Sequence, residues 1–223
     1  MDTPAPVGRL DIISDAICPW CYIGKRHLER ALPMLAREGL EFEVHWHAYQ
    51  LNPEMPAAGV DRRDYRIAKF GSWERSQELD ARITEAGAAV GLGFRMDLQR
   101  RTPNTVAAHR TIWLAGRHGV QDAVVEALFA GYFTQGADIG DPATLAGLAA
   151  GAGLDGDAVL AMLAGEEGRA EVLGEDEMAR RSGIDGVPSF TMAGHVLFSG
   201  AVPAETMAQA FSRAWRILSS QAA

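Results

Sequence analysis

The chain has 223 residues, 48% of them hydrophobic and 22% charged, which is the composition of a globular protein able to bury a core without disulfide bonds. Its formal net charge of −8 argues against nucleic acid or an anionic membrane as the main partner. No segment approaches the ~18 apolar residues of a membrane-spanning helix, and residues 1–8 lack the basic and apolar regions of a secretory signal. We therefore expect a cytoplasmic protein.

The two cysteines of the sequence stand close together near its start. Residues 9–14 have the apolar character of a short buried strand, and Cys18 and Cys21 follow after a turn. Pro19 favours the first position of a helix, so we expect the helix to begin at Cys18 or Pro19. Cysteines that are three residues apart in the first turn of a helix share one face. Their Cα atoms are then close enough for a disulfide, which needs a separation of about 5.5–6 Å.

This spacing points to chemistry rather than to structural cross-linking. In the cytoplasm a lone C-x-x-C pair is kept mostly reduced, and it is then more often catalytic or metal-binding than structural. A tetrahedral zinc site needs two further ligands, and the six histidines offer no H-x3-H pair to complete it. We therefore expect redox chemistry at Cys18 and Cys21, and no metal.

A strand–helix–strand unit carries the cysteines. Residues 24–37 have the apolar spacing of a helix, although Pro33 predicts a kink or an early end. Residues 41–49 then alternate with period two, as a half-buried strand does. The two strands should be parallel with a right-handed crossover. In such sheets ligands bind at the carboxyl ends of the strands, where the cysteines lie.

The sequence changes character after residue 52. Helical patterns follow one another to about residue 171, and no convincing strand interrupts them. We predict a short helix that begins at Asp141-Pro142. Further helices are predicted over residues 61–70, 73–90, 105–118, 121–134, 157–163 and 167–181. This block, roughly residues 53–171, is expected to be an all-helical unit inserted into an α/β frame.

Strand patterns return towards the end of the chain. Residues 187–192 and 195–199 flank the tight turn Ala193-Gly194, which predicts a β-hairpin. A last amphipathic helix is predicted over residues 203–217. The sequence contains no internal repeat and no low-complexity tract, so neither a solenoid nor a long linker is expected.

Several motifs together resemble the thioredoxin superfamily, and within it the DsbA-like branch. C-P-W-C lies at the start of the first helix, and the distant G-V-P of residues 186–188 begins the second unit. The fuller pattern resembles FrnE-type members, which are related to 2-hydroxychromene-2-carboxylate isomerases. Its segments are S-D-A-I-C-P-W-C-Y-I-G-K at residues 14–25, L-N-P-E-M-P at 51–56, G-V-D at 59–61, N-T at 104–105 and A-H-R at 108–110.

The resemblance implies an α/β, thioredoxin-like fold, built as βαβ followed by ββα, with an inserted all-helical domain. The thioredoxin-like domain would comprise residues 1–52 and 172–223, and the insertion domain residues 53–171. Because the insertion follows the thiol-bearing unit, we expect it to cover that edge of the sheet and to select substrates.

The resemblance also implies roles for individual residues. Cys18 is expected to be the exposed nucleophile, Cys21 the resolving thiol, and Pro188 a cis proline that faces them. The positive end of the helix dipole favours a thiolate at Cys18, and such cysteines have pKa values of roughly 3.5–7.5. Cys21, one turn further in, should be more shielded. Val187 and Pro188 would dock an extended substrate strand through the backbone.

Other residues are weaker candidates. Trp20 is equally compatible with a contact to substrate and with packing. Asp15 lies three residues before Cys18, and we expect a turn residue there rather than a proton relay. Four histidines are expected to make local hydrogen bonds rather than to take part in catalysis, and they are His27, His45, His47 and His109.

These inferences favour a cytoplasmic thiol–disulfide oxidoreductase that acts on a protein or a small-molecule thiol or disulfide. We expect no cofactor, with glutathione or the thioredoxin system as candidate redox partner. One alternative is a glutathione-dependent isomerase or transferase acting on an aromatic or polyketide-like molecule; those relatives carry serine at the position that matches Cys18. Another is a peptide-binding, chaperone-like module, which has no need of C-P-W-C.

Overall fold

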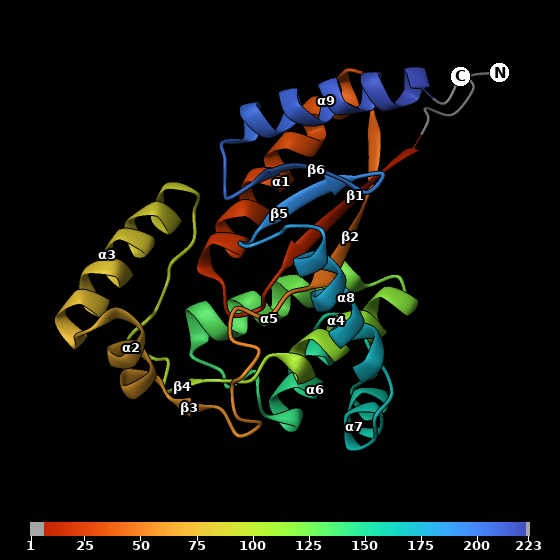
Figure 1. Cartoon of the computed structure of the whole chain (residues 1–223). Helices are drawn as coiled ribbons and strands as arrows, with labels where there is room; N and C mark the ends of the chain where they lie inside the picture. The colour runs from red at the N-terminus through yellow and green to blue at the C-terminus, as the bar shows by residue number, and fades with distance from the viewer. Residues whose placement is uncertain (1–6, 222–223) are drawn as a thin grey trace.

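The structure is a computed structural model that describes residues 7–221. It combines a mixed sheet with a large group of helices (Figure 1). In chain order the elements are β1 (Val7–Ser14), α1 (Pro19–Arg37), β2 (Glu41–Ala48), β3 (Val60–Asp61), α2 (Arg62–Phe70), α3 (Trp73–Ala89), β4 (Arg101–Thr102), α4 (Val106–Arg117), α5 (Gln121–Gln135), α6 (Pro142–Gly151), α7 (Gly156–Ala164), α8 (Arg169–Arg181), β5 (Ser189–Met192), β6 (His195–Ser199) and α9 (Ala204–Gln221).

The main sheet has the strand order β2-β1-β5-β6. β1 and β2 are parallel, with Ile12 opposite Trp46, whereas β5 is antiparallel to β1, with Phe190 on the other side of Ile12. β5 and β6 form an antiparallel hairpin. The predicted parallel unit around α1 and the predicted hairpin are therefore both confirmed.

Helices cover both faces of this sheet. Figure 1 shows α1 and α9 side by side along one face and α8 on the other. On the first face Phe42 of β2 and Phe190 of β5 both pack against Phe211 of α9, with ring centroids 6.4 and 5.9 Å away. On the second face Ile13 of β1 packs in a smaller cluster with Ala179 of α8. Successive side chains of a strand point to opposite faces of the sheet, so the sheet has two apolar faces. One packs against α1 and α9 and the other against α8.

Helix α1 covers the full stretch over which its sequence has helical spacing. It continues through Pro33 to Arg37, so the predicted early end is wrong. Proline removes one backbone hydrogen bond from a helix, but the face that carries Leu28, Ala31 and Leu35 is fully buried in the core. This burial keeps the turn after Pro33 helical.

The helices between β2 and α8 form the insertion. Figure 1 shows α2 and α3 as a separate pair beside the group that contains α4 to α7. The insertion also holds a short antiparallel pair, in which Val60 of β3 lies opposite Thr102 of β4. Strands of two residues are too short to produce an alternating pattern, so the sequence did not predict them.

A buried lysine joins the insertion to α1. Lys25 is 2% exposed, and its Nζ lies 2.5 Å from Glu29 on the same helix and 3.0 Å from Asp122 of α5. One turn earlier, the Tyr22 hydroxyl donates to Glu126 of α5 at 2.7 Å. Burial lowers the pKa of Lys25, but Asp122 and Glu29 outweigh it, and the net shift is upward. The lysine therefore stays charged and holds α5 against the helix that carries the cysteines.

Acidic side chains of α8 hold this helix against the end of β2. Glu175 accepts a hydrogen bond from the Ala48 amide at 2.8 Å, and Asp176 accepts one from the Gln50 amide, also at 2.8 Å. His47 lies between two carboxylates, with Nδ1 2.9 Å from Glu175 and Nε2 2.7 Å from Asp11. α8 is thereby fixed next to the segment that leads into β5.

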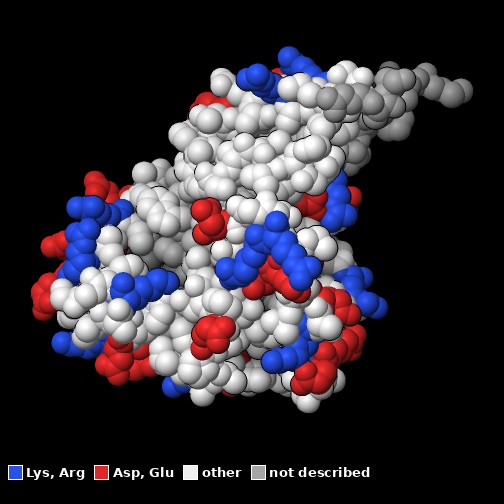
Figure 2. All heavy atoms as spheres, in the orientation of Figure 1, with Lys and Arg blue, Asp and Glu red and all other residues white. Residues whose placement is uncertain are grey.

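Charged side chains of both signs are mixed on the surface. The face drawn in Figure 2 carries Lys and Arg beside Asp and Glu, without a large patch of one sign. Within residues 7–221, no helix has the length and apolar character needed to cross a membrane.

The position of His47 predicts a pH-dependent contribution to stability. Burial alone would lower the pKa of His47, but hydrogen bonds and the charges of Glu175 and Asp11 raise it above its usual value. A raised folded-state pKa stabilises the protein below the unfolded pKa, and this contribution is lost as the pH rises through the folded pKa. In urea titrations between pH 6 and 9, the free energy of unfolding of the wild type should fall by on the order of 1 kcal/mol more than that of His47→Gln. Parallel curves for the two proteins would contradict this account.

Candidate active site

The two cysteines occupy the first turn of α1. Cys18 is the N-cap residue with extended backbone angles (φ −92°, ψ 110°), and Pro19 takes the first helical position, as predicted. The Cys18 amide donates to the Asp15 carbonyl at 2.9 Å, and the Cys21 amide donates to the Cys18 carbonyl at 3.0 Å. The turn after β1 therefore places Cys18 at the amino terminus of the helix, where backbone amides lack helical partners.

The segment before β5 lies directly against this turn. The Cys18 thiol donates to the Val187 carbonyl across 3.5 Å, and the Val187–Pro188 peptide bond is cis. Gly24 of α1 makes this close approach feasible, because a Cβ atom there would lie only 3.0 Å from Pro188 Cγ. The structure thus brings the turn that carries Cys18 and Cys21 together with Val187 and Pro188, although Cys18 and Val187 are 169 residues apart in the sequence.

The exposure of the three candidate side chains in this turn differs. Cys21 is fully buried, as expected, and Trp20 is 43% exposed. Cys18 is only 4% exposed, so the expectation of an exposed nucleophile is wrong for this structure. The Val187 carbonyl lies against the thiol, and Cys18 also lines a cavity.

This cavity of about 370 Å³ lies between the cysteine-bearing turn and the insertion. One wall consists of residues 17–20 together with Gly186 and Val187, and Trp20 belongs to it. The opposite wall comes from the insertion, with Tyr65 and Lys69 of α2 among its residues. The volume suits a small-molecule ligand. From the sequence we expected the insertion to cover this edge of the sheet, but the sequence did not identify the residues that form the wall.

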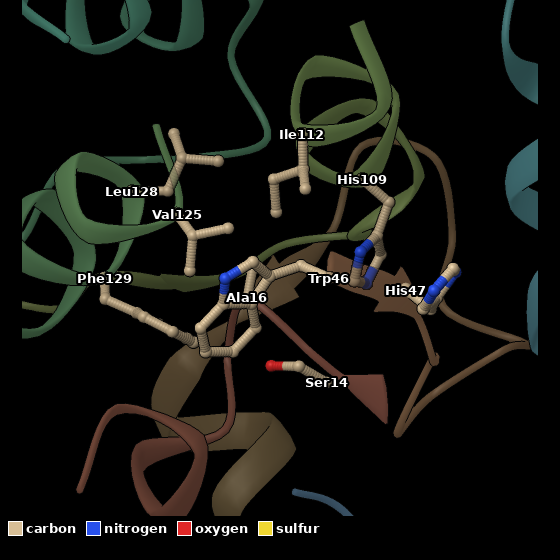
Figure 3. A pocket seen from close by; sticks show the side chains of 9 residues that line it. All are labelled: Ser14, Ala16, Trp46, His47, His109, Ile112, Val125, Leu128 and Phe129. Carbon is tan, nitrogen blue, oxygen red and sulfur yellow. The ribbon is translucent and has the colours of Figure 1, made fainter. Parts of the chain in front are cut away.

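Polar groups lie next to the buried thiol of Cys21. Burial raises the pKa of Cys21 well above its usual value, and the neighbouring Cys18 raises it further, whereas Ser14 and the Asp15 backbone oppose the shift. Figure 3 shows Ser14 beside Trp46 and His109 in a second, enclosed cavity of about 10 Å³. That volume is at the lower limit for one water molecule, and neither cysteine lines this cavity.

Asp15 ties the cysteine-bearing turn to the rest of the fold. Its side chain is fully buried and accepts a hydrogen bond from the Leu51 amide at 2.7 Å. His109 Nε2 lies 3.3 Å from the same carboxylate and 3.1 Å from the Tyr49 carbonyl. The Asp15 carbonyl accepts from the Cys18 amide within the turn after β1, while the side chain binds residues that are distant in the sequence.

The histidines do not line the cavity beside Cys18. His47 and His109 make hydrogen bonds to residues distant in the sequence, whereas His45 Nε2 lies 3.3 Å from Glu43 but has no hydrogen-bond partner among the described residues. Throughout residues 7–221, no group of three or more His, Cys, Asp or Glu side chains is arranged to hold a metal ion. The two free thiols, Cys18 and Cys21, are the candidate reactive groups of this site.

Comparison with known proteins agrees with this arrangement. The family model described as DSBA-like thioredoxin domain matches residues 9–212. The chain belongs to this family. Its structure superposes on that of a probable DsbA oxidoreductase from Streptomyces coelicolor with a TM-score of 0.83, at 34% identity over 93% of this chain and 90% of the other. The thioredoxin-like fold with a helical insertion and the resemblance to the DsbA-like branch are thus confirmed.

Two more distant structures share the fold. The 2-hydroxychromene-2-carboxylate isomerase structure has a TM-score of 0.68, at 14% identity over 96% of this chain and 98% of the other. The cytosolic disulfide reductase DsbM from Pseudomonas aeruginosa, solved with glutathione, has a TM-score of 0.60, at 20% identity over 96% and 98%. Proteins that share this fold therefore differ in the reactions they are named for. The fold alone does not indicate the reaction of this chain, so the residues of the site have to be considered.

The burial of Cys21 predicts that its thiol is unreactive in the folded protein. In a Cys18→Ser variant, alkylation of Cys21 by iodoacetamide at pH 8 should be at least about tenfold slower in native buffer than in urea, because the thiolate is disfavoured and access is blocked. Mass spectrometry of the alkylated protein measures both rates. Equal rates in the two solvents would show that Cys21 is accessible and would contradict the structure.

Proposed function

We propose that this protein is a thiol–disulfide oxidoreductase in which Cys18 is the attacking thiol and Cys21 the resolving thiol. The observation that carries the proposal is the asymmetry of the pair. Cys18 borders the large cavity at a helix amino terminus, whereas Cys21 lies fully buried one turn behind it. An attacking thiol needs access to substrate, and a resolving thiol needs access only to its partner.

The proposed reaction exchanges two electrons between the pair and a disulfide substrate. The Cys18 thiolate attacks one sulfur of the substrate, forms a mixed disulfide and releases the first substrate thiolate. Cys21 then loses its proton and attacks the Cys18 sulfur, which closes the Cys18–Cys21 disulfide and releases the second thiolate. The two protons of the cysteines end on the two product thiols, and the reverse sequence oxidises a dithiol.

Val187 and Pro188 are proposed to hold the substrate rather than to transfer protons. The Val187 carbonyl lies at hydrogen-bond distance from the Cys18 thiol, so a backbone segment of a bound peptide would lie beside the reacting sulfur. Trp20, which is 43% exposed and lines the cavity, is proposed as a further substrate contact.

We propose residues 1–52 and 172–223 as the thioredoxin-like domain and residues 53–171 as an insertion domain that selects substrates. The proposal is supported by the cavity, whose wall opposite Cys18 comes from α2, α3 and the segment around Met96. Substrate has to pass between the two parts to reach the thiol.

A cytoplasmic reductase recycled by glutathione or the thioredoxin system fits these features. The fold is shared with DsbM, a cytosolic disulfide reductase whose structure was solved with glutathione. Measuring the reduction potential of the Cys18–Cys21 pair would indicate the direction of the reaction. A value at or below the cytoplasmic glutathione poise, about −220 to −320 mV, would support reduction, and a higher value would support oxidation or isomerisation.

A glutathione-dependent isomerase is the second candidate, and the cavity beside Cys18 is the observation in its favour. Isomerases of small molecules need such a cavity, and the fold is shared with 2-hydroxychromene-2-carboxylate isomerase. That reaction has no use for a second, buried thiol. Cys21 therefore favours disulfide exchange.

Two serine variants test the assigned roles. When the reduced protein is mixed with 2-hydroxyethyl disulfide, the wild type should release two thiols per chain and close its own disulfide. Cys21→Ser should release one thiol and retain a mixed disulfide on Cys18, and Cys18→Ser should react only at the background rate. Thiol titration and intact mass measure both quantities. A mixed disulfide on Cys21, or exchange in Cys18→Ser, would refute the assignment.

A further inference from the structure

The buried thiol of Cys21 has to lose a proton before it can attack in the proposed exchange. Cys21 is fully buried and does not line the cavity beside Cys18. In the mixed disulfide, the substrate is attached to Cys18 on the side of that cavity. The proton of Cys21 therefore needs a path on the other side of the cysteine-bearing turn.

The Ser14 hydroxyl lies next to Cys21 on that side. Burial raises the pKa of the Cys21 thiol, and hydrogen bonds from the Ser14 side chain and the Asp15 backbone oppose this rise. Ser14 is the last residue of β1 and also lines the enclosed cavity of about 10 Å³ (Figure 3). A hydroxyl can accept one proton while it donates another, so Ser14 can pass a proton from the thiol to this cavity.

His109 of α4 lines the same enclosed cavity (Figure 3). Trp46 and His47 are the other polar side chains on it, but their ring nitrogens are already bonded to carboxylates. Ser14 and His109 are thus the side chains through which this cavity can exchange protons. Its volume admits about one water molecule, which would connect the two.

The contacts of His109 fix which of its nitrogens can accept a proton. Nε2 lies 3.1 Å from the Tyr49 carbonyl oxygen and 3.3 Å from the Asp15 carboxylate. Both of these oxygens accept hydrogen bonds, so Nε2 carries the hydrogen of the neutral imidazole and Nδ1 is the basic nitrogen. Asp15 is fully buried and His109 is 3% exposed, so solvent screens their attraction little. The carboxylate therefore stabilises the imidazolium that forms when Nδ1 takes a proton.

A third cavity, of about 410 Å³, continues this path towards the surface. His109, Trp46 and Ile112 line both this cavity and the enclosed one. Glu43 also lines it, and the Glu43 side chain is 68% exposed. The charged and titratable groups that face His109 from the neighbouring elements are Asp15 in the turn after β1, Glu43, His45 and His47 of β2, Arg117 of α4, Asp122 of α5 and Glu175 of α8.

We propose that Asp15 and His109 form the base that takes the proton of Cys21 in the resolving step, with Ser14 as the relay. The inference rests on the function proposed above, because it concerns the second step of the same exchange. The S–H bond of Cys21 breaks, and its proton replaces the one that Ser14 passes across the enclosed cavity to Nδ1 of His109. The freed electron pair forms the bond to Cys18, while the bond from Cys18 to the substrate breaks and its electrons leave on the substrate thiolate. The imidazolium then releases its proton to solvent through the third cavity.

Rapid mixing of the reduced protein with excess 2-hydroxyethyl disulfide separates the two steps. Formation of the mixed disulfide on Cys18 becomes faster in proportion to the disulfide concentration. Its resolution by Cys21 is unimolecular, so at high concentration the rate constant reaches a plateau. Acid quenching followed by intact mass measures the fraction of mixed disulfide at each time. Every variant thus reports separately on the attack and on the resolution.

His109→Gln keeps a donor for the Tyr49 carbonyl but removes the base. At pH 7 it should slow the resolution about 100-fold and change the first attack less than about twofold, since general bases contribute ~10²–10⁴-fold. The wild-type plateau should change less than about threefold between pH 7 and 9, because the proton moves between two groups of the protein. In His109→Gln the plateau should rise about tenfold per pH unit, because hydroxide then has to remove the proton.

His47→Gln is the matched control. It removes an imidazole from the same enclosed cavity, but one whose nitrogens are already bonded to carboxylates. Its resolution should stay within about threefold of the wild type and keep the wild-type pH profile, because its nitrogens are not free to take the proton.

Ser14→Ala tests the relay and removes a single oxygen, so it carries the test if His109→Gln does not fold. It should slow the resolution about tenfold or more and give the same steep pH profile. The double variant Ser14→Ala/His109→Gln should resolve no more than about threefold slower than His109→Gln alone, because the two residues act in one path.

The outcomes separate this inference from the proposed function. If the wild type forms no mixed disulfide and closes no protein disulfide, the proposed function fails first. If both steps occur but His109→Gln keeps the wild-type plateau or its pH profile, the relay is refuted and the oxidoreductase stands. Equal slowing of both steps, or an equal effect of His47→Gln, also refutes the relay, because either result indicates a structural role.

Discussion

The buried carboxylate of Asp15 is the interaction on which the rest of the site depends. A buried carboxylate is costly unless it is hydrogen-bonded, and here the Leu51 amide and His109 supply the partners. Leu51 follows β2 and His109 belongs to α4, so one side chain connects the cysteine-bearing turn to the second strand and to the insertion. Cys18 can border a cavity on one side and Val187 on the other only because this turn has a single position.

A second set of charged and polar contacts holds the insertion against α1, the helix that carries the cysteines. Lys25 and Tyr22 of α1 reach Asp122 and Glu126 of α5, so the helix that carries the thiols also carries the contacts to the insertion. Contacts of α1 therefore fix the positions of both walls of the cavity. Under the proposed function, a substrate held by the insertion would therefore meet Cys18 at a defined position, so that binding contacts remote from the sulfur would affect exchange.

The features that sequence predicts well here are those that depend on neighbouring residues. Pro19 after Cys18 located the start of α1, and the alternation of residues 41–49 located β2, because capping and period two are local. The burial of Cys18 was not predictable, since it depends on a segment 169 residues away. The polar side chains of α2 that line the cavity, such as Tyr65 and Lys69, are visible in the sequence as a stripe, but a solvated helix face has the same spacing. Only the packing of α2 opposite the thiols distinguishes the two cases.

Net charge and local charge lead to different conclusions about partners. The value of −8 argues against long polyanions, which contact many phosphates across a broad surface. A small carboxylate senses only the charges within about 8–10 Å, the screening distance at physiological salt. In the cavity beside Cys18, these include Lys69, which forms no ion pair with a carboxylate within residues 7–221. An acidic protein can therefore present local positive charge to a small anion, as Lys69 does in the cavity that Cys18 also lines.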